Sequence, residues 1–158
     1  MSRIEGKAML SFRDAKEADL PFIVGLVAAA LVVETGDDPE RALEGPYRDA
    51  LAAIAADPNN RLVVAECDGE PVGTIQLTFI PGIMRRGMWR LLVEQVHIAS
   101  AERGKGLGAE MMAWAIAEAR ARGCGMVQLT SNKQRRDAHR FYERLGFERS
   151  HEGFKLYL

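Results

Sequence analysis

Arg103-Gly104-Lys105-Gly106-Leu107-Gly108 is the stretch of this chain that decides its fold and its ligand. It joins an apolar, β-branched run that ends at Ile98 to a run typical of a helix, which opens near Gly106. Three alternate glycines let the backbone turn tightly and let a ligand approach it closely. The helix that follows offers unpaired N–H groups and the positive end of its dipole. Together with the charges of Arg103 and Lys105, these features predict a pyrophosphate site.

Two well-known phosphate loops do not fit this spacing. The Walker pattern has four residues between its first glycine and Gly-Lys-Ser/Thr, and no Ser or Thr follows the lysine here. The dinucleotide fingerprint is Gly-x-Gly-x-x-Gly after the first strand of a βαβ unit, whereas this chain has Gly-x-Gly-x-Gly late in its length. On the stretch alone, a glycine-rich turn that binds nothing remains the alternative.

The order of elements outward from this loop predicts a mixed α/β fold in one domain over residues 10–158. Apolar periodicity and turn residues give the boundaries. Strands are expected over 10–13, 62–67, 72–80, 89–98, 126–130 and 154–158, the last at the edge of the sheet. Helices are expected over 19–33, 46–56, 106–122 and 137–145, with Asp137 capping the last one. Such an order places helices on the faces of a sheet.

Composition excludes several classes of protein. A formal net charge of -1 over 158 residues gives no reason to expect a nucleic-acid partner. The longest apolar run, 22–33, is shorter than the ~20 residues that span a bilayer, so no membrane partner is expected. Cys67 and Cys124 form neither a disulfide framework nor a metal cluster. We therefore expect a cytoplasmic protein without a metal.

A second motif makes the first one specific. Phe141-Tyr142-Glu143-Arg144-Leu145-Gly146-Phe147 follows the glycine loop by about forty residues. Arg-x-x-Gly-x-Gly followed by Tyr-x-x-x-Gly-Phe resembles the GNAT superfamily of acetyltransferases, over roughly residues 10–158. Residues 130–132 and 137–142 are also similar to the end of the aminoalkylphosphonate acetyltransferases within it. The resemblance implies a mostly antiparallel sheet, splayed at the cofactor site, and acetyl-CoA as the acyl donor.

The resemblance also assigns cofactor contacts. The backbone of Val96, His97 and Ile98 is expected to pair with the pantetheine arm, and the loop from Arg103 through Gly104, Lys105, Gly106 and Leu107 to Gly108 is expected to hold the pyrophosphate. Many members carry an asparagine seven residues before the tyrosine, where this chain has Arg135, although Ala138 matches. Either Asn132 or Arg135 is therefore expected to contact the cofactor.

Two residues are candidates for proton transfer. By the resemblance, Tyr142 returns a proton to the departing thiolate. Glu94 is the expected base for the attacking ammonium, directly or through water, since an amine must lose a proton before it attacks. Strict strand alternation puts Glu94 on the same side as Val96 and Ile98 and puts His97 on the opposite side.

The expected activity is transfer of an acetyl group to a primary amine of a small molecule by direct attack. In this family the first two helices and the loop between the third and fourth strands wall the acceptor site. Acids there favour a cationic amine, and arginines favour an amine that also carries an anionic group; these residues are Glu34, Asp37, Asp38, Glu40, Glu44, Arg85, Arg86 and Arg90. A protein or peptide N-acetyltransferase and a non-catalytic acyl-CoA-binding regulator are the alternatives. Homodimers are common in the family, but no heptad or exposed apolar stripe indicates one here.

Overall fold

The computed structural model describes residues 9–30 and 33–158. They fall into two compact units, Met1–Gln128 and Leu129–Leu158, which are treated separately below. The larger unit carries the sheet and most of the helices, and the smaller one carries a single described helix. The expectation of one domain over residues 10–158 stays a prediction.

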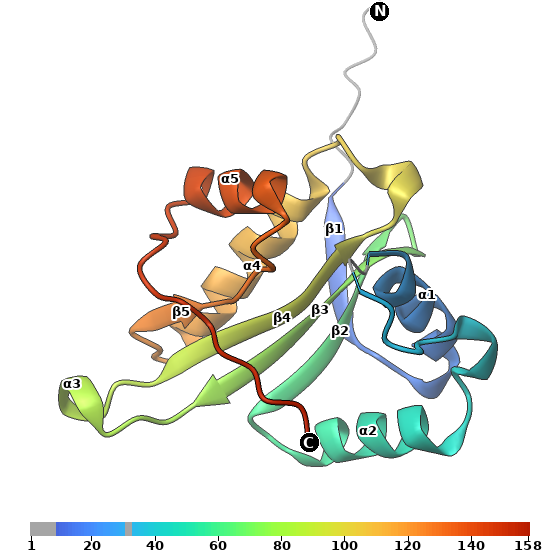
Figure 1. The fold of residues 1–158 in the computed structure, drawn as a ribbon, viewed down its shortest axis with the longest axis horizontal. Helices are drawn as coiled ribbons and strands as arrows, with labels where there is room; N and C mark the ends of the chain where they lie inside the picture. Colours follow the sequence, from blue (N-terminus) through green and yellow to red (C-terminus); the bar gives the residue numbers. More distant parts are fainter. Residues whose placement is uncertain (1–8, 31–32) are drawn as a thin grey trace, which may run out of the picture. The chain divides into compact units, whose positions relative to one another are not determined.

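The described residues of the first unit form a five-stranded sheet in the order β1-β2-β3-β4-β5 (Figure 1). Neighbouring strands are antiparallel except for β4 and β5, which are parallel, so the expected mixed, mostly antiparallel sheet is confirmed. The strands are β1 Leu10–Asp14, β2 Asn60–Cys67, β3 Glu70–Ile80, β4 Arg90–Ile98 and β5 Met126–Gln128. The α-helices are α1 Leu20–Ala30, α2 Gly45–Ala56, α3 Met84–Gly87 and α4 Leu107–Ala121.

Helices flank both faces of this sheet (Figure 1). On the α4 face, Trp114 stacks on Phe12 of β1 with ring centroids 4.3 Å apart, and Arg122 lies 4.2 Å over the ring of Phe79. Burial on this face contributes about 1.5–3 kcal/mol for each large apolar side chain. The fully buried ones on β3, β4 and α4 include Ile75, Leu77, Phe79, Leu91, Val93, Met111 and Met112. On the other face, α1 buries Leu20, Ile23 and Val24.

A charged cluster joins β1 to the start of α1. Arg13 donates two hydrogen bonds to the carboxylate of Asp19, at 2.7 and 2.9 Å, and a third to Glu66 at 2.6 Å. Asp19 is buried and also accepts a hydrogen bond from the backbone N–H of Lys16. The hydrogen bonds from Arg13 hold the pKa of Asp19 below its ordinary value. This cluster therefore stabilises the ionised carboxylate in the folded protein.

The turn between β3 and β4 has an unusual backbone. Arg85 and Arg86 have φ of 53° and 63°, and Gly87 continues the same left-handed conformation at 79°. A left-handed helical residue other than glycine costs roughly 1–2 kcal/mol. Two backbone bonds, from Gly87 N–H to Ile83 and from Met88 N–H to Met84, hold this single turn.

The second unit contains α5, Arg136–Arg144, and two sequence expectations fail there. Asp137 does not cap the helix, because the helix begins one residue before it and its carboxylate instead pairs with Arg140. Residues 154–158 form no strand, and Phe154, Leu156 and Tyr157 are exposed. A strand needs a paired neighbour for its backbone groups, and none of the described residues provides one there.

The remaining helix and strand boundaries differ from expectation by one to a few residues. α1 is described only to Ala30, so the expected continuation to residue 33 runs through residues 31–32, which lie outside the described residues. The Asp-Gly turn between β2 and β3 forms as predicted, with φ of 51° at Asp68 and 81° at Gly69.

Candidate functional site

The edge of β4 that faces β5 is only partly paired. β5 pairs with Arg90, Leu91 and Leu92 and goes no further, so among the described residues the ladder stops before residues 93–98. A strand edge with free N–H and C=O groups is suited to an extended ligand that adds to the sheet like another strand. Val96, His97 and Ile98, the expected pantetheine-binding residues, lie in the part of β4 beyond its ladder with β5.

A β-bulge interrupts β4 just before these residues. The ladder pairs Gln76 with Glu94 and Thr74 with His97, so β4 advances three residues while β3 advances two. The extra residue is at Gln95, whose φ is 52°. Because a bulge adds one residue without changing the pairing on either side, the alternation of faces shifts by one residue across it.

The bulge overturns the expected facing of the side chains of β4. Residues paired directly across a ladder share a face, so Glu94 and His97 lie on the face of Gln76 and Thr74. Ile98 pairs with Gly73 and lies on the opposite face. The expectation that Glu94 shares a side with Ile98 and that His97 opposes it is therefore wrong. The side chain of His97 makes a 3.0 Å hydrogen bond through Nε2 to Oε1 of Gln95.

The glycine-rich loop ends in a helix terminus with open donors. Gly104 and Gly106 have φ of 79° and 78°, and a Cβ built on either would meet nothing within 4 Å. Gly106 is the N-cap of α4, and no side chain caps that terminus. The backbone N–H groups of residues 104–108 donate to no described residue. Lys105 forms an ion pair with Glu102 at 2.8 Å, so the backbone is the main donor set for an anion.

The second unit positions Tyr142 through the end of its own helix. Gly146 has φ of 93°; its N–H bonds to the C=O of Glu143, and the N–H of Phe147 bonds to the C=O of Tyr142. These two bonds form a Schellman motif, in which the residue after the glycine packs on the helix. Here Phe147 makes an edge contact with the ring of Tyr142 at 5.8 Å. The Tyr-x-x-x-Gly-Phe pattern is therefore the sequence of a helix end that fixes its tyrosine.

The environment of Tyr142 favours its protonated form. The residue is half-buried, and burial raises the pKa of its phenol above the ordinary value of 10, while the charge of Arg135 opposes that rise. The phenol therefore keeps its proton at neutral pH and is able to donate it.

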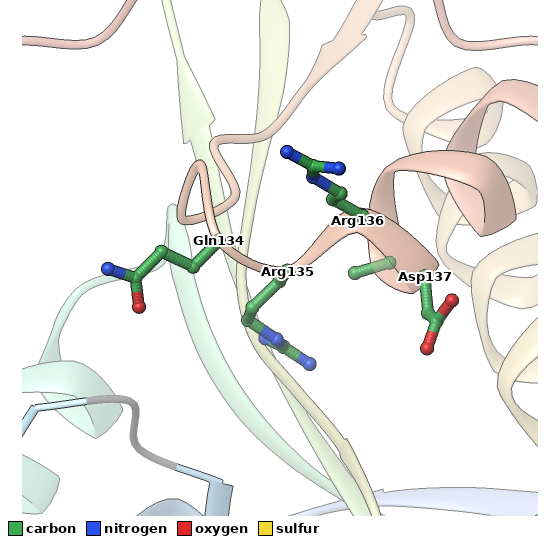
Figure 2. Close-up of a pocket in the computed structure, with 5 residues that line it drawn as sticks. Gln134, Arg135, Arg136 and Asp137 are labelled. Carbon is green, nitrogen blue, oxygen red and sulfur yellow. The ribbon is translucent and has the colours of Figure 1, made fainter.

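An open pocket lies at the start of α5, lined by residues 134–138, including Arg135 and Ala138 (Figure 2). Asn132 folds this loop, because its Oδ1 accepts from Gln134 N–H at 2.9 Å and its C=O accepts from Arg135 N–H at 3.0 Å. The Asn132 carbonyl is thus committed within the loop, whereas the guanidinium of Arg135 extends away from it (Figure 2). Nearby in the sequence, the hydroxyl of Ser131 is buried without a partner among the described residues.

Some of these features carry no clear sequence signal. The bulge falls on a glutamine, although glycine is the residue that favours a left-handed conformation, and the end of the β4–β5 ladder follows no marked residue.

The described part of the chain holds no group of three or more His, Cys, Asp or Glu side chains able to bind a metal ion. Within residues 9–30 and 33–158, none of the helices combines the length and apolar character needed to cross a membrane.

Comparisons with known proteins agree on one family. Residues 28–147 match the model of the acetyltransferase (GNAT) family. The chain is 37% identical over 108 residues to an aminoalkylphosphonate N-acetyltransferase of Salmonella typhimurium, which covers 68% of this chain and 70% of that protein. Among solved structures it resembles a transcriptional regulator from Bacillus halodurans C-125, with a TM-score of 0.88 and 42% identity. A putative acetyltransferase from Agrobacterium tumefaciens gives a TM-score of 0.78 at 28% identity. Each of these two alignments covers 94% of this chain and 99% of the other.

Proposed function

Because this chain belongs to the acetyltransferase (GNAT) family and is therefore an N-acetyltransferase, we propose that it transfers the acetyl group of acetyl-CoA to a primary amine of a small molecule by direct attack. The observation that carries the proposal is the continuous run from the part of β4 beyond its ladder with β5 to the uncapped start of α4. This run offers backbone hydrogen bonds to the extended pantetheine arm of the cofactor and then a group of N–H donors for its pyrophosphate.

The residues present fit acetyl-CoA on these grounds. In the proposal, the backbone of Val96, His97 and Ile98 binds the pantetheine arm, and the N–H groups of residues 104–108 bind the pyrophosphate. The open space at Gly104 and Gly106 supports this assignment, since a Cβ there would occupy the approach to the donors. Between Asn132 and Arg135 we favour Arg135 as the further cofactor contact, because its guanidinium is exposed and suited to phosphate.

When bound, acetyl-CoA supplies an activated thioester. Glu94 takes a proton from the acceptor ammonium, directly or through water, and so frees the nitrogen lone pair for attack. Tyr142 would donate its proton to the departing sulfur, and its phenolate would take up, directly or through water, the proton that the new amide nitrogen loses. The raised pKa of Tyr142 supports this role, because a phenol that holds its proton at neutral pH is ready to donate it.

A small cationic amine is the proposed acceptor. The similar protein of Salmonella typhimurium is named for an aminoalkylphosphonate, which joins an amine to an anionic group. The acids of residues 34–44 would attract the amine, and Arg85, Arg86 and Arg90 would attract the anionic group. Glu44 is ion-paired with Arg41, and Asp37 accepts from the hydroxyl of Tyr47, so Glu34 and Glu40 are the stronger candidates within that segment.

A thiol-release assay tests the proposal. The protein is given acetyl-CoA and a panel of amines grouped by charge: simple alkylamines, amino acids, aminoalkylphosphonates and a peptide with a free N-terminus. Amine-dependent release of CoA thiol with a small amine, lowered by Glu94→Gln most strongly at pH values where the amine is protonated, is the expected result. Release with the peptide alone would contradict the small-molecule acceptor.

One observation favours a second candidate. The solved structure that is 42% identical to this chain is named a transcriptional regulator, and a non-catalytic acyl-CoA-binding regulator is one of the two alternatives that the sequence leaves open. Calorimetry with acetyl-CoA separates the two functions. Tight binding of acetyl-CoA, with no release of CoA thiol in the presence of any amine, would favour the regulator. Binding with amine-dependent release of the thiol supports the enzyme.

A further inference from the structure

The sheet face that carries Glu94 also carries a row of half-buried polar side chains. In the ladders, Asn60 of β2 pairs with Thr78 of β3, and Gln76 of β3 pairs with Glu94 of β4. All four therefore lie on one face, because paired residues share a face and residues two apart in a strand do too. Asn60, Gln76 and Thr78 are each only partly exposed, whereas Glu94 is exposed.

Asn60 fixes how the amide of Gln76 is turned. Its Oδ1 accepts from Nε2 of Gln76 at 3.3 Å and from the hydroxyl of Thr78 at 3.4 Å. The amide nitrogen of Gln76 is thus engaged on the side of β2. Its Oε1 makes no hydrogen bond to any described residue, and it is the remaining acceptor of that amide.

The pairing places the side chains of Gln76 and Glu94 directly opposite each other. Side chains directly opposite each other in an antiparallel ladder have Cβ atoms about 4.5–5.5 Å apart. A primary ammonium has three N–H donors, so it can donate to both Glu94 and Gln76 and keep one further direction free. After Glu94 has taken a proton, the neutral amide oxygen still accepts an N–H of the amine and keeps the nitrogen in place.

We propose that Gln76 binds the acceptor nitrogen beside Glu94 and that Asn60 positions Gln76 for this contact; the inference rests on the proposed function. The same contact also distinguishes primary from secondary amines as acceptors. After it attacks, the nitrogen must lose one more proton: a primary amine loses one N–H and keeps the other for Gln76, whereas a secondary amine loses its only N–H and keeps none. The arrangement therefore favours primary amines over their N-methyl analogues.

The test compares Gln76→Met, which keeps the length of the side chain and removes the oxygen, with Thr78→Val as the matched control. Thr78 lies in the same row and contacts Asn60, but its ladder partner on β4 is Leu92 and not Glu94. Steady-state kinetics measure the KM for the amine, the KM for acetyl-CoA and the preference for the primary amine over its N-methyl analogue. The amine is the best acceptor found in the thiol-release panel.

Gln76→Met is expected to raise the amine KM about tenfold or more, as the loss of a hydrogen bond to a charged group predicts, and to leave the acetyl-CoA KM unchanged. It is also expected to lose most of the preference against the N-methyl analogue, while Thr78→Val stays within about twofold of the wild type in both properties. Gln76→Glu, which retains an acceptor oxygen, is expected to keep the amine KM near that of the wild type, whereas Gln76→Ala, which removes the oxygen, is expected to raise it and serves if Gln76→Met does not fold.

Two outcomes would overturn the inference, and they are distinguishable. An unchanged amine KM and an unchanged N-methyl preference in Gln76→Met, with a wild type that acetylates amines, overturn the role of Gln76 alone. A wild type that acetylates no amine in the panel overturns the proposed function and this inference with it.

Discussion

At the scale of single residues, the proposed chemistry depends on two groups held in different ways. Tyr142 is fixed by the end of its helix, where Gly146 and Phe147 close a Schellman motif around it. Glu94 is exposed on a strand, and its surroundings come from its ladder partner rather than from burial. A half-buried acid that keeps its proton and an exposed base that is open to a substrate are suited to the two ends of one proton-transfer sequence.

Tyr142→Phe is expected to lower kcat by about 10²–10⁴-fold, because the departing sulfur loses its proton donor. The dissociation constant for acetyl-CoA is expected to change little. For the wild type, the raised pKa of the phenol predicts that donation by Tyr142 persists to a higher pH than the ordinary phenol pKa of 10 would allow. Rates measured from pH 6 to 10.5 test both statements.

Tyr157→Phe is the matched control for this variant, since it removes an exposed phenol from the same unit. Its kcat should equal that of the wild type. If Tyr142→Phe also retained full turnover, the proton would have to come from another group.

At the scale of elements, the start of α4 is the feature most specific to the proposed ligand. The structure offers a comparison within one helix, because Gly106 precedes α4 and Gly123 follows it, with φ of 78° and 76°. A Cβ at either glycine would have open space around it. Alanine at each position should therefore cause similar backbone strain, about 1–2 kcal/mol, at opposite ends of the dipole.

Gly106→Ala is expected to raise the dissociation constant for acetyl-CoA at least tenfold, because the added Cβ and the strain disturb the N–H donors, whereas Gly123→Ala should leave it unchanged. Calorimetry measures the affinity, and thermal unfolding checks that both variants lose comparable stability. Equal affinities in the two variants would remove the loop from the cofactor site.

The sequence predicts those elements whose signals are local. Asp68-Gly69 specifies a hairpin turn, and the glycine loop specifies a strand-to-helix turn, because only a few residue types tolerate the backbone angles there. The bulge at Gln95 lacks such a signal, since it depends on how two strands pair over many residues. Strict alternation accordingly gave the wrong face for His97, and residues 154–158 formed no strand despite their alternating pattern.

At the scale of the whole molecule, folding stability should depend on pH through Asp19. Hydrogen bonds from Arg13 lower its pKa in the folded protein, so the carboxylate contributes stability above its unfolded value of about 3.8. That contribution is lost as pH falls through the lower, folded value. Asp19→Asn is expected to cost about 1–3 kcal/mol at pH 7 and to flatten the loss of stability below pH 4.

Glu17→Gln is the control for this prediction, because Glu17 pairs with Arg48 where both side chains are 54% exposed. Such surface pairs contribute about 0–1 kcal/mol. Urea unfolding of both variants at pH 7 and pH 3 measures the difference. If Asp19→Asn unfolded with the same pH dependence as the wild type, the cluster around Arg13 would not contribute to acid sensitivity.

The bulge in β4 also bears on how such a chain can change by insertion and deletion. Since Gln95 is the surplus residue, removing its codon would restore regular pairing with β3 and leave Glu94, His97 and Ile98 each on its present face. The backbone shape of the strand and the faces of its side chains can therefore change independently by mutation. A lineage could gain or lose the bulge at this position without changing the face on which Glu94, His97 or Ile98 lies.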